Sequence, residues 1–431
     1  MLRAASLNKD LKEKMEKRVV ITGIGAITPV GNHAEETWKN LVEGNCGIDL
    51  IQGLDEYNLP VKVAGQVKNF DKSEYELDSG LARRSDRYCI YAMAAASDAM
   101  KDAGLKSGEN IDPERLGVYI GSGIGGMDTF VSQTKVMLEE GVGRISPFFV
   151  PMMISNIASG NVAISHNAQG VCLPVVTACA TGTHAAGEAY RAIKHGYADA
   201  IITGGAEASV HPLAIGGFAN SKALSREEDP LKASLPFSAD RHGFVIAEGA
   251  GVMIFESLEN ALKRGAKIYA EVVGYGNSCD AHHFTAPRPD GIPASRAIKQ
   301  ALDEANFDAD KDLLYINAHG TGTPLNDAAE TKAIKLAMGE EAAKKAKITS
   351  TKSITGHMLG ATGAVELIAS ALSLHHGIVT PTIGLTNQDP ECDLDYTPLK
   401  AVEAPLTVAI SNSLGFGGHN ACVALRKWDG Q

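Results

Sequence analysis

The sequence predicts an α/β protein built from two similar halves. Three pairs of segments carry this prediction, because in each segment an apolar, β-branched run ends in glycines. The pairs are RVVITGIG (18–25) with KIYAEVVGYGNS (267–278), LGVYIGSG (116–123) with LLYINAHGTG (313–322), and ADAIITGGAEA (198–208) with PLTVAISNSLGFGGHN (405–420). Ala-rich helical patterns alternate with these strands, so each half is expected to be a βα unit. Sites in such folds lie at strand ends and where the halves meet.

The length and the amino-acid composition of the chain fit this organisation. A chain of 431 residues exceeds the usual size of a single core, and 44% hydrophobic with 21% charged residues is ordinary for a globular protein. We expect an N-terminal extension or non-native remnant at 1–17, a first half at 18–266 and a second half at 267–427. The first 17 residues mix acidic and basic side chains and have no apolar core, which argues against a targeting signal.

Charge and cysteine usage exclude several classes of protein. The formal net charge of −11 argues against nucleic-acid binding. Seven scattered cysteines without a CxxC pair favour neither a disulfide framework nor a zinc site, and they indicate a reducing compartment. No apolar run reaches the length of about 18 residues that predicts a membrane span. We therefore expect a cytoplasmic protein without membrane insertion.

The segment VVTACATGTH at 175–184 is the first candidate for chemistry. Residues 175–177 predict the end of a buried strand, and a helix is expected over about 182–195. Cys179 then lies at the turn before the helix, where unpaired N–H groups and the helix dipole favour the thiolate. Such a position predicts a lowered pKa and a nucleophile. The alternative is a buried structural cysteine, the common fate of a free thiol.

The second half supplies two histidines at similar positions. His319 follows a buried strand in NAHGTGTPLNDAAE, and His357 lies with Lys352 in the strand-to-helix turn of TSTKSITGHMLGATGAVELI. A lone histidine is more often a hydrogen-bonded structural residue than a functional one. Two histidines at glycine-rich strand ends in one half, with Cys179 at a strand end in the other, favour a single shared site.

A GxGxxG pattern at Gly121, Gly123 and Gly126 follows a strand and invites a nucleotide interpretation. No acidic strand end follows about 20 residues later, as a dinucleotide fold requires. Close approach of backbone is the better explanation of these glycines.

Together, these motifs resemble those of the β-ketoacyl-acyl-carrier-protein synthases, the condensing enzymes of fatty-acid synthesis, and among them the elongating type II enzymes. The resemblance covers about 18–427 and rests on VVTACATGTHA, NAHGTGT, TKSITGHMLGATGAVE and SNSLGFGGHNA in that order. It implies a thiolase-like fold, in which two βα halves form a five-layer αβαβα sandwich, and a homodimer.

The resemblance also implies a reaction. Cys179 would take an acyl group from an acyl-carrier-protein thioester. Malonyl-acyl-carrier protein would then lose CO2, and its enolate would attack the acyl-enzyme to give β-ketoacyl-acyl-carrier protein. His319 and His357 would donate hydrogen bonds to the enolate oxygen. No metal or organic cofactor is required.

Further roles follow from the resemblance, residue by residue. The backbone N–H groups of Cys179 and Phe416 would form an oxyanion hole, with Lys352 and Glu366 as a buried charge pair. The gate around Phe416 would be formed by Gly415, Gly417 and Gly418. Pantetheine would be bound by Thr321 and Thr323, and the acyl chain by Ile124, Phe149 and Phe218. Docking of the acidic carrier protein would use Arg83, Arg84, Lys222 and Arg226. Some members hold a structural Na+ or K+ near positions matching Asn317, Glu330, Glu366, Ser411 and Asn412.

Three alternatives remain open. A thiolase shares the fold but needs a second active-site cysteine in a CxG setting, and Cys422 lies in HNACVAL instead. A polyketide-type ketosynthase would share all the motifs. A non-condensing partner subunit would have Gln or another residue in place of Cys179. Leu414 and His419, where Phe and Thr are common in the family, flank the gate.

Overall fold

The apolar strand runs of the first half form four neighbouring strands. The computed structural model describes residues 16–430, so residues 1–15 of the extension predicted at 1–17 lie outside the described residues. The strands are β1 (Val19–Ile27), β4 (Leu116–Gly121), β5 (Ala200–Glu207) and β6 (Gly249–Ser257), arranged as β4-β5-β6-β1. β4 and β5 are parallel, whereas the pairs β5–β6 and β6–β1 are antiparallel. All four strands are buried along their whole length.

The second half repeats this arrangement. Its strands are β7 (Ala270–Cys279), β8 (Leu314–Asn317), β12 (Val408–Gly415) and β13 (His419–Lys427), in the order β8-β12-β13-β7, with β9 (Lys347–Thr349) beside β8. The parallel pair β8–β12 and the antiparallel pairs β12–β13 and β13–β7 match the first half strand for strand. The predicted duplication is confirmed, because the segments that echo each other in sequence occupy equivalent strands.

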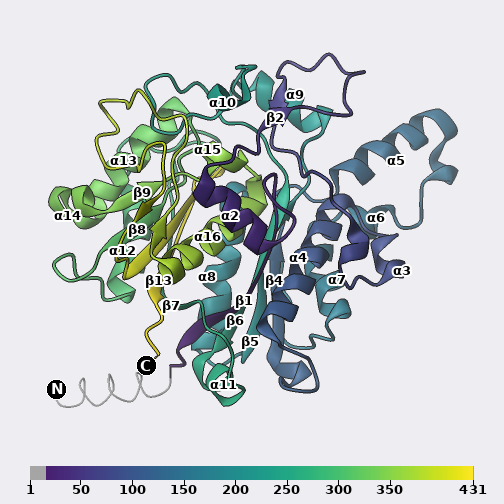
Figure 1. Cartoon of the computed structure of the whole chain (residues 1–431). Helices are drawn as coiled ribbons and strands as arrows, with labels where there is room; N and C mark the ends of the chain where they lie inside the picture. Colours follow the sequence, from purple (N-terminus) through teal and green to yellow (C-terminus); the bar gives the residue numbers. More distant parts are fainter. Residues whose placement is uncertain (1–15, 431) are drawn as a thin grey trace.

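The two sheets meet at one end. β1 pairs with β7 over three residues, Val19–Ile21 against Ala270–Val272, so that nine strands are connected by hydrogen bonds. Beyond this short junction, the sheets diverge and enclose helices between them (Figure 1).

Helices complete five layers. α8 (Thr181–Lys194) and α16 (Thr362–His376) contact strands of both halves and form the central layer (Figure 1). α4 (Arg87–Ala103) and α7 (Ile157–Ser165) cover the outer face of the first sheet, and α12 (Ile292–Glu304) and α13 (Pro324–Met338) lie on the side of the second. The αβαβα sandwich predicted from the resemblance is confirmed.

The central helices approach each other very closely. A Cβ at Gly182 would lie 2.7 Å from the backbone N of Ala364, and one at Gly363 would lie 2.0 Å from Thr183 Oγ1. Only glycine fits at these two contacts. The helix start that carries the nucleophile motif is therefore held directly against the second half.

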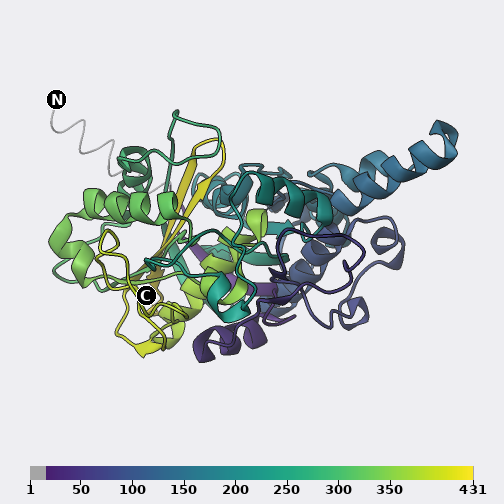
Figure 2. The ribbon, with the colours of Figure 1, turned by 90° about the horizontal axis from the view of Figure 1, so that it is seen from above.

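Other elements surround this core. The remaining helices are α2 (Ala34–Glu43), α3 (Ser79–Ala82), α5 (Met127–Glu140), α6 (Phe149–Met153), α9 (Pro212–Asn220), α10 (Pro230–Ala233), α11 (Leu258–Lys263), α14 (Glu340–Lys345) and α15 (Lys352–Thr355). Short strands are β2 (Asp49–Leu50), β3 (Val63–Ala64), β10 (Ile378–Val379) and β11 (Val402–Glu403). α5 projects from the body of the molecule (Figure 2). Within residues 16–430, no helix is long and apolar enough to cross a membrane.

One predicted strand is not formed. Residues 171–177 run beside β4, where Val118 N donates to Val171 O and Leu173 N donates to Val118 O, but the pairing is limited to a single bridge. Val176 is 51% exposed, so the β-branched run before Cys179 is not the buried strand that we predicted. The equivalent segment of the second half, β9, does pair with β8. The helix prediction was right to within one residue at each end, since α8 spans Thr181–Lys194.

Candidate active site

Cys179 lies in a strained turn at the start of α8. It is the middle residue of a single 3-10 turn (Ala178–Ala180) that runs directly into the helix, and Ala178 before it has φ of +50°. A positive φ at a non-glycine residue is uncommon and persists only where the surroundings enforce it. Two backbone N–H groups lower the pKa of the Cys179 thiol by hydrogen bonding to its sulfur, that of Cys179 in this turn and that of Phe416 between β12 and β13. This is the arrangement expected of an oxyanion hole.

The protonation state of Cys179 differs from the prediction. Burial raises the pKa of the thiol to about 12, and the carboxylate of Glu207 also raises it, whereas the charge of Lys352 and the two N–H groups lower it. The helix start therefore acts in the predicted direction, but loss of solvation outweighs it. The resting side chain is a thiol, and the lowered pKa predicted from its position was wrong.

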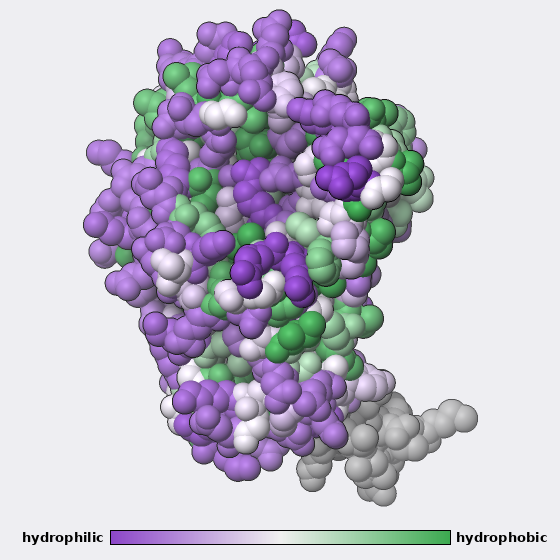
Figure 3. All heavy atoms as spheres, turned by 90° about the vertical axis from the view of Figure 1, so that its right-hand side faces the viewer, coloured by the Kyte–Doolittle hydropathy of each residue, from purple (hydrophilic) through white to green (hydrophobic). Residues whose placement is uncertain are grey.

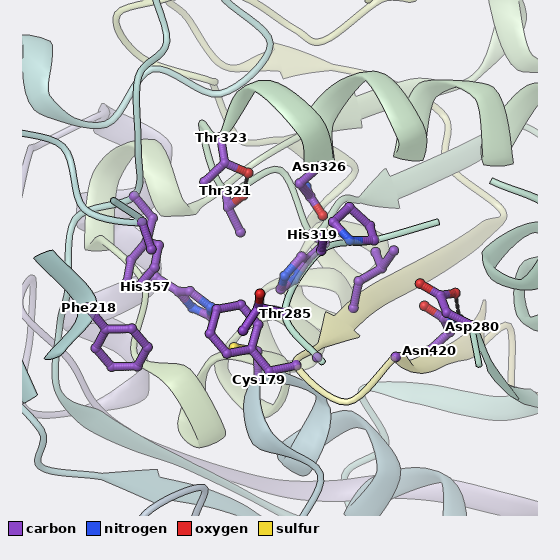
Figure 4. Close-up of a pocket in the computed structure, with 18 residues that line it drawn as sticks. Cys179, Phe218, Asp280, Thr285, His319, Thr321, Thr323, Asn326, His357 and Asn420 are labelled. Atoms are coloured by element: carbon purple, nitrogen blue, oxygen red, sulfur yellow. Dashed lines mark hydrogen bonds between the residues drawn. The ribbon is translucent and has the colours of Figure 1, made fainter. Parts of the chain in front are cut away.

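The two histidines face each other at the wall opposite Cys179 (Figure 4). Their ring centroids are 5.4 Å apart and nearly perpendicular, and both residues are almost fully buried. Burial and the charge of Lys352 lower both histidine pKa values far below the usual range, so both rings are neutral. His357 Nδ1 lies 2.9 Å from Thr362 Oγ1, and no group of the described chain contacts its Nε2. With the Thr362 hydroxyl donating to Nδ1, the Nε2–H of His357 is free to donate to a ligand.

Two buried carboxylates hold this wall in place. Glu330 accepts from the backbone N–H groups of His319 and Gly320, each at 2.8 Å, and so fixes the turn after β8. Lys352 and Glu366 form the predicted ion pair at 2.5 Å, with both side chains 1% exposed. Burial raises the pKa of each carboxyl, Glu330 and Glu366, to about 7. Lys352 also supplies the positive charge that keeps both histidines neutral.

A small cavity joins these groups. It has a volume of about 80 Å3 and is lined by residues of both halves, including Cys179, His319, His357, Phe218 and Phe416 (Figure 4). Thr321 and Thr323 also line it, with their hydroxyl oxygens 3.0 Å apart. Ligand sites of drug size have volumes of about 300 Å3 or more, so this cavity must open to admit an acyl chain.

The segment around Phe416 closes the cavity. Gly417 and Gly418 have φ of +89° and +78°, and Gly417 N donates to Phe284 O at 2.8 Å. A Cβ at Gly415 would lie 2.5 Å from Thr177 O, so this glycine is needed where the segment touches the nucleophile turn. The Phe416 ring packs against Phe218. The glycines therefore serve close approach and a left-handed turn, as a gate requires.

Not every predicted site residue lies at the cavity. Ile124 and Phe149 are not among its lining residues, and Phe149 packs against Phe130 of α5. Arg83, Arg84, Lys222 and Arg226 are all exposed. Arg84 lies over the ring of Phe148, and Lys222 adopts a φ of +59°.

The residues predicted to surround a cation contain unpaired polar atoms. Buried oxygens without a hydrogen-bond partner in the described chain are Asn317 Oδ1, Glu366 Oε2, Ser411 Oγ and Asn412 Oδ1. Asn317 and Ser411 pair in neighbouring strands, and Asn317 Nδ2 donates to the Glu366 carbonyl. Oxygen ligands suit a hard cation such as Na+ or K+, and an unpaired buried oxygen is costly. The donor set therefore fits the predicted ion, with Glu330 engaged instead by the turn at His319.

Sequence reasoning assigned no role to three polar residues of this region, the pair Asp280 and Asn420 and the carboxylate Glu207. Asp280 and Asn420 line it and are joined by a hydrogen bond of 2.7 Å. Glu207, at the end of β5, is fully buried and accepts from backbone N–H groups of both halves. The signal for Glu207 was present in the sequence, because a carboxylate that ends a wholly apolar strand must be paired or functional.

The GxGxxG glycines are explained by packing. A Cβ at Gly121 would lie 2.0 Å from Val175 O, and one at Gly126 would lie 2.5 Å from Met152 O. Gly123 directs its N–H to Glu207. The interpretation of these glycines as close-approach positions, and not as a nucleotide loop, agrees with these contacts.

A strained cysteine turn and two neutral buried histidines, brought together by a duplicated five-layer core, define the class of condensing acyltransferases. Residues 16–261 match the family model described as "Beta-ketoacyl synthase, N-terminal domain", and residues 269–386 match "Beta-ketoacyl synthase, C-terminal domain". The chain belongs to the β-ketoacyl synthase family.

Curated relatives agree over nearly the whole chain. A protein of Staphylococcus aureus (strain COL) named 3-oxoacyl-[acyl-carrier-protein] synthase 2 is 51% identical over 413 residues, which cover 96% of this chain and 99% of that protein. A protein of the same name from Synechocystis sp. is 49% identical over 414 residues, with the same coverage.

Solved structures agree in fold. A chain in the structure of a type II PKS acyl-carrier protein in complex with its ketosynthase matches with a TM-score of 0.87 and 34% identity, over 96% of this chain and all of that one. A β-ketoacyl synthase from Burkholderia phymatum STM815 matches with a TM-score of 0.88 and 32% identity, with the same coverage.

Proposed function

We propose that this protein elongates fatty acyl chains by decarboxylative condensation of malonyl-acyl-carrier protein with an acyl group held on Cys179. The observation that carries the proposal is that Cys179 of one half and His319 and His357 of the other half line the same cavity. The 51% identity to proteins named 3-oxoacyl-[acyl-carrier-protein] synthase 2 supports the elongating type over a polyketide ketosynthase.

In the first step, the Cys179 sulfur attacks the thioester carbon of an acyl-carrier protein. The new C–S bond forms first and gives a tetrahedral intermediate, and the old C–S bond then breaks as this intermediate collapses. The thiol proton leaves with the departing carrier thiol. The N–H groups of Cys179 and Phe416 stabilise the oxyanion of the tetrahedral intermediate. Because the resting residue is a thiol, this transfer of the proton is part of the step.

In the second step, the malonyl thioester loses its carboxylate as CO2, and the electron pair of the broken bond forms an enolate. The neutral rings of His319 and His357 donate N–H groups to the enolate oxygen. The enolate carbon then attacks the acyl carbonyl, a C–C bond forms, and Cys179 leaves as a thiolate that takes up a proton. Neutral histidines suit this role, because a neutral ring N–H donates a hydrogen bond to the enolate oxygen and keeps its proton. A resting imidazolium would be acidic enough to protonate the enolate before it attacks.

Substrate entry requires the Phe416 segment to move. Thr321 and Thr323 line the cavity and are assigned to the pantetheine arm. Phe218 packs against the ring of Phe416, and Ile124 and Phe149 are assigned to the acyl chain. The exposed cations Arg83, Arg84, Lys222 and Arg226 supply local positive charge to a chain of net charge −11, as docking of an acidic carrier protein demands.

The homodimer is also part of the proposal. The face that carries α5 to α7 shows apolar patches among polar ones (Figure 3). Exposed apolar side chains of this region and of the neighbouring edge segment are Leu138, Val142, Val150, Ile164, Leu173 and Val176. Exposed apolar patches of this kind are typical of interfaces between proteins and support the dimer.

A structural Na+ or K+ would be held by the unpaired oxygens of Asn317, Glu366, Ser411 and Asn412, where it would give these buried polar atoms a partner.

The test is intact mass after incubation with a long-chain acyl-carrier protein. We expect the wild type to gain the mass of the acyl group, and Cys179→Ala to gain nothing. Addition of malonyl-carrier protein should then release the extended β-keto product. Acylation by acyl-CoA but not by carrier-bound chains would instead support a thiolase or CoA-primed enzyme, and no acylation by either would support a non-condensing subunit.

A further inference from the structure

Glu207 is a fully buried carboxylate that connects the two halves of the protein beside the nucleophile. Its Oε1 accepts from Ser122 Oγ at 2.8 Å and from Ile124 N at 3.2 Å. Its Oε2 accepts from Gly123 N at 2.8 Å and from Gly360 N at 3.0 Å. Four donors around one carboxylate replace the water that burial removes.

The donors come from two segments that the proposed reaction uses. Gly123 and Ile124 belong to the segment after β4, to which the acyl-chain residue Ile124 was assigned. Gly360 lies three residues after His357, in the turn before α16. Glu207 is therefore placed between the acyl-chain segment of the first half and the enolate-binding segment of the second.

Space around the carboxylate is fully used. A Cβ at either Gly123 or Gly360 would lie 2.8 Å from Glu207 Oε2, and a Cβ at Gly360 would also lie 2.6 Å from Gly123 N. The two segments thus touch through backbone, with the carboxylate as the group that both contact. Glycine at both positions is a requirement of this contact.

Glu207 also acts on Cys179 through its charge. Its carboxylate raises the pKa of the Cys179 thiol, in opposition to Lys352. The negative charge near the sulfur disfavours a thiolate in the same cavity.

We propose that Glu207 is a positioning residue that fastens the Ile124 segment to the His357–Gly360 segment and thereby controls which acyl lengths Cys179 accepts. The proposal rests on the proposed function, since it assigns to Glu207 the selectivity of that same acyl site. Ile124 is assigned to the acyl chain but does not line the closed cavity, whose volume is about 80 Å3. A chain long enough to reach Ile124 therefore needs space that opens only when the Ile124 segment moves, whereas a short chain does not need this movement. The hydrogen bond from Ile124 N to Glu207 resists that displacement.

Glu207→Gln separates this role from simple packing. Glutamine replaces one carboxylate oxygen by an NH2 group, which donates hydrogen bonds and cannot accept them. At the Oε2 position, this NH2 group would face the N–H donors of Gly123 and Gly360. At the Oε1 position, it would face Ser122 Oγ and the N–H of Ile124. Only Ser122 Oγ can turn to accept from it, so the amide takes the Oε1 position and Ile124 N loses its acceptor. The N–H groups of Gly123 and Gly360 keep an acceptor, the carbonyl oxygen of the glutamine. Glu207→Asp retains the charge but withdraws it by one methylene group.

The first readout is the acylation of Cys179 by long-chain and by short-chain acyl-carrier proteins, compared as kcat/KM. We expect the ratio of long to short to rise about fivefold in both variants, the factor that corresponds to loss of one hydrogen bond. The second readout is alkylation of Cys179 by iodoacetamide at pH 8.5. Its rate should rise about threefold in Glu207→Gln, which removes the charge, and stay near the wild-type rate in Glu207→Asp.

Glu256→Gln is the matched control. Glu256 on β6 is equally buried and accepts from Thr22, Asn260 and Arg264, but none of these partners belongs to the Ile124 segment or to the His357–Gly360 segment. The Glu256→Gln substitution should lower the melting temperature and leave unchanged both the long-to-short ratio of kcat/KM and the alkylation rate of Cys179. If Glu207→Gln also lowers only the melting temperature, Glu207 is structural and the proposal is overturned. Failure of the wild type to be acylated would refute the proposed function, and the alkylation rates would still test the effect of Glu207 on Cys179.

Discussion

At the scale of single residues, charge and burial around Cys179 decide the chemistry. Burial is the main cause that lowers both histidine pKa values and raises the Cys179 pKa. Lys352 adds to the first effect and opposes the second, while Glu207 raises the Cys179 pKa further. One buried cation thus acts on all three reacting groups. The nucleophile is held as a thiol within a site built to stabilise an oxyanion and not a thiolate.

The raised pKa predicts a pH dependence for Cys179. Below its pKa, the thiolate fraction of a cysteine rises tenfold for each pH unit, and the thiolate is the reactive species. Because burial raises the pKa to about 12, we expect the rate of iodoacetamide alkylation at Cys179 to rise about tenfold per unit from pH 7 to pH 9, without a plateau. The rate is measured by peptide mass spectrometry, with Cys179→Ala to identify the site. A plateau below pH 8 would contradict the thiol assignment.

At the scale of elements, the decisive contact is between the gate and the nucleophile turn. The turn from β12 to β13 carries Phe416, and its first glycine lies against the backbone of residues 177–180. Two glycines with positive φ follow. We infer that the proposed gate and the proposed oxyanion hole are coupled, because a backbone movement of the Phe416 segment would also move the Phe416 N–H.

Gly415→Ala tests this contact. The added Cβ would lie 2.5 Å from Thr177 O, a distance that real Cβ atoms do not tolerate, so the gate segment must shift away from Cys179. We expect acyl transfer to fall by about tenfold or more, because misplacement of about 1 Å at a reacting centre has effects of this size. The measurement is the single-turnover rate of Cys179 acylation.

Gly216→Ala is the matched control for this substitution. Nothing lies within 4 Å of a Cβ at Gly216, which is inside helix α9. The alanine should leave acylation unchanged and stabilise the helix by about 0.5–1 kcal/mol. Equal activity of the two variants would show that the gate segment does not set the oxyanion hole.

At the scale of the whole molecule, the two halves share one interior. α8 of the first half and α16 of the second half lie between both sheets, and the largest cluster of buried apolar side chains includes residues of both. Neither half could bury the inner face of its sheet without the central helices of the other. The active site lies on this shared layer, which explains why its cysteine and histidines come from different halves.

This shared interior predicts a single cooperative unfolding transition. The two tryptophans, Trp38 and Trp428, both contact residues of the opposite half: Trp38 stacks on His376, and Trp428 lies against Arg18. In urea, the fluorescence of Trp428→Phe and of Trp38→Phe should each show the same midpoint as circular dichroism, at one protein concentration. Two separate midpoints would mean that the halves unfold independently.

The sequence by itself determined the duplicated α/β core, because apolar, β-branched runs that end in glycines define strand ends. It also singled out Cys179, His319 and His357, which lie in glycine-rich turns after such runs, although the run before Cys179 forms no strand. The family resemblance also implied the pair of Lys352 and Glu366, which the structure confirms. Tertiary structure decided what depends on surroundings: the exposed segment before Cys179, the raised pKa of its thiol, the distance of Ile124 and Phe149 from the closed cavity, and the link through Glu207. Solvation, backbone approach and pairing between distant segments are properties of the packed molecule, and a local pattern of residues does not contain them.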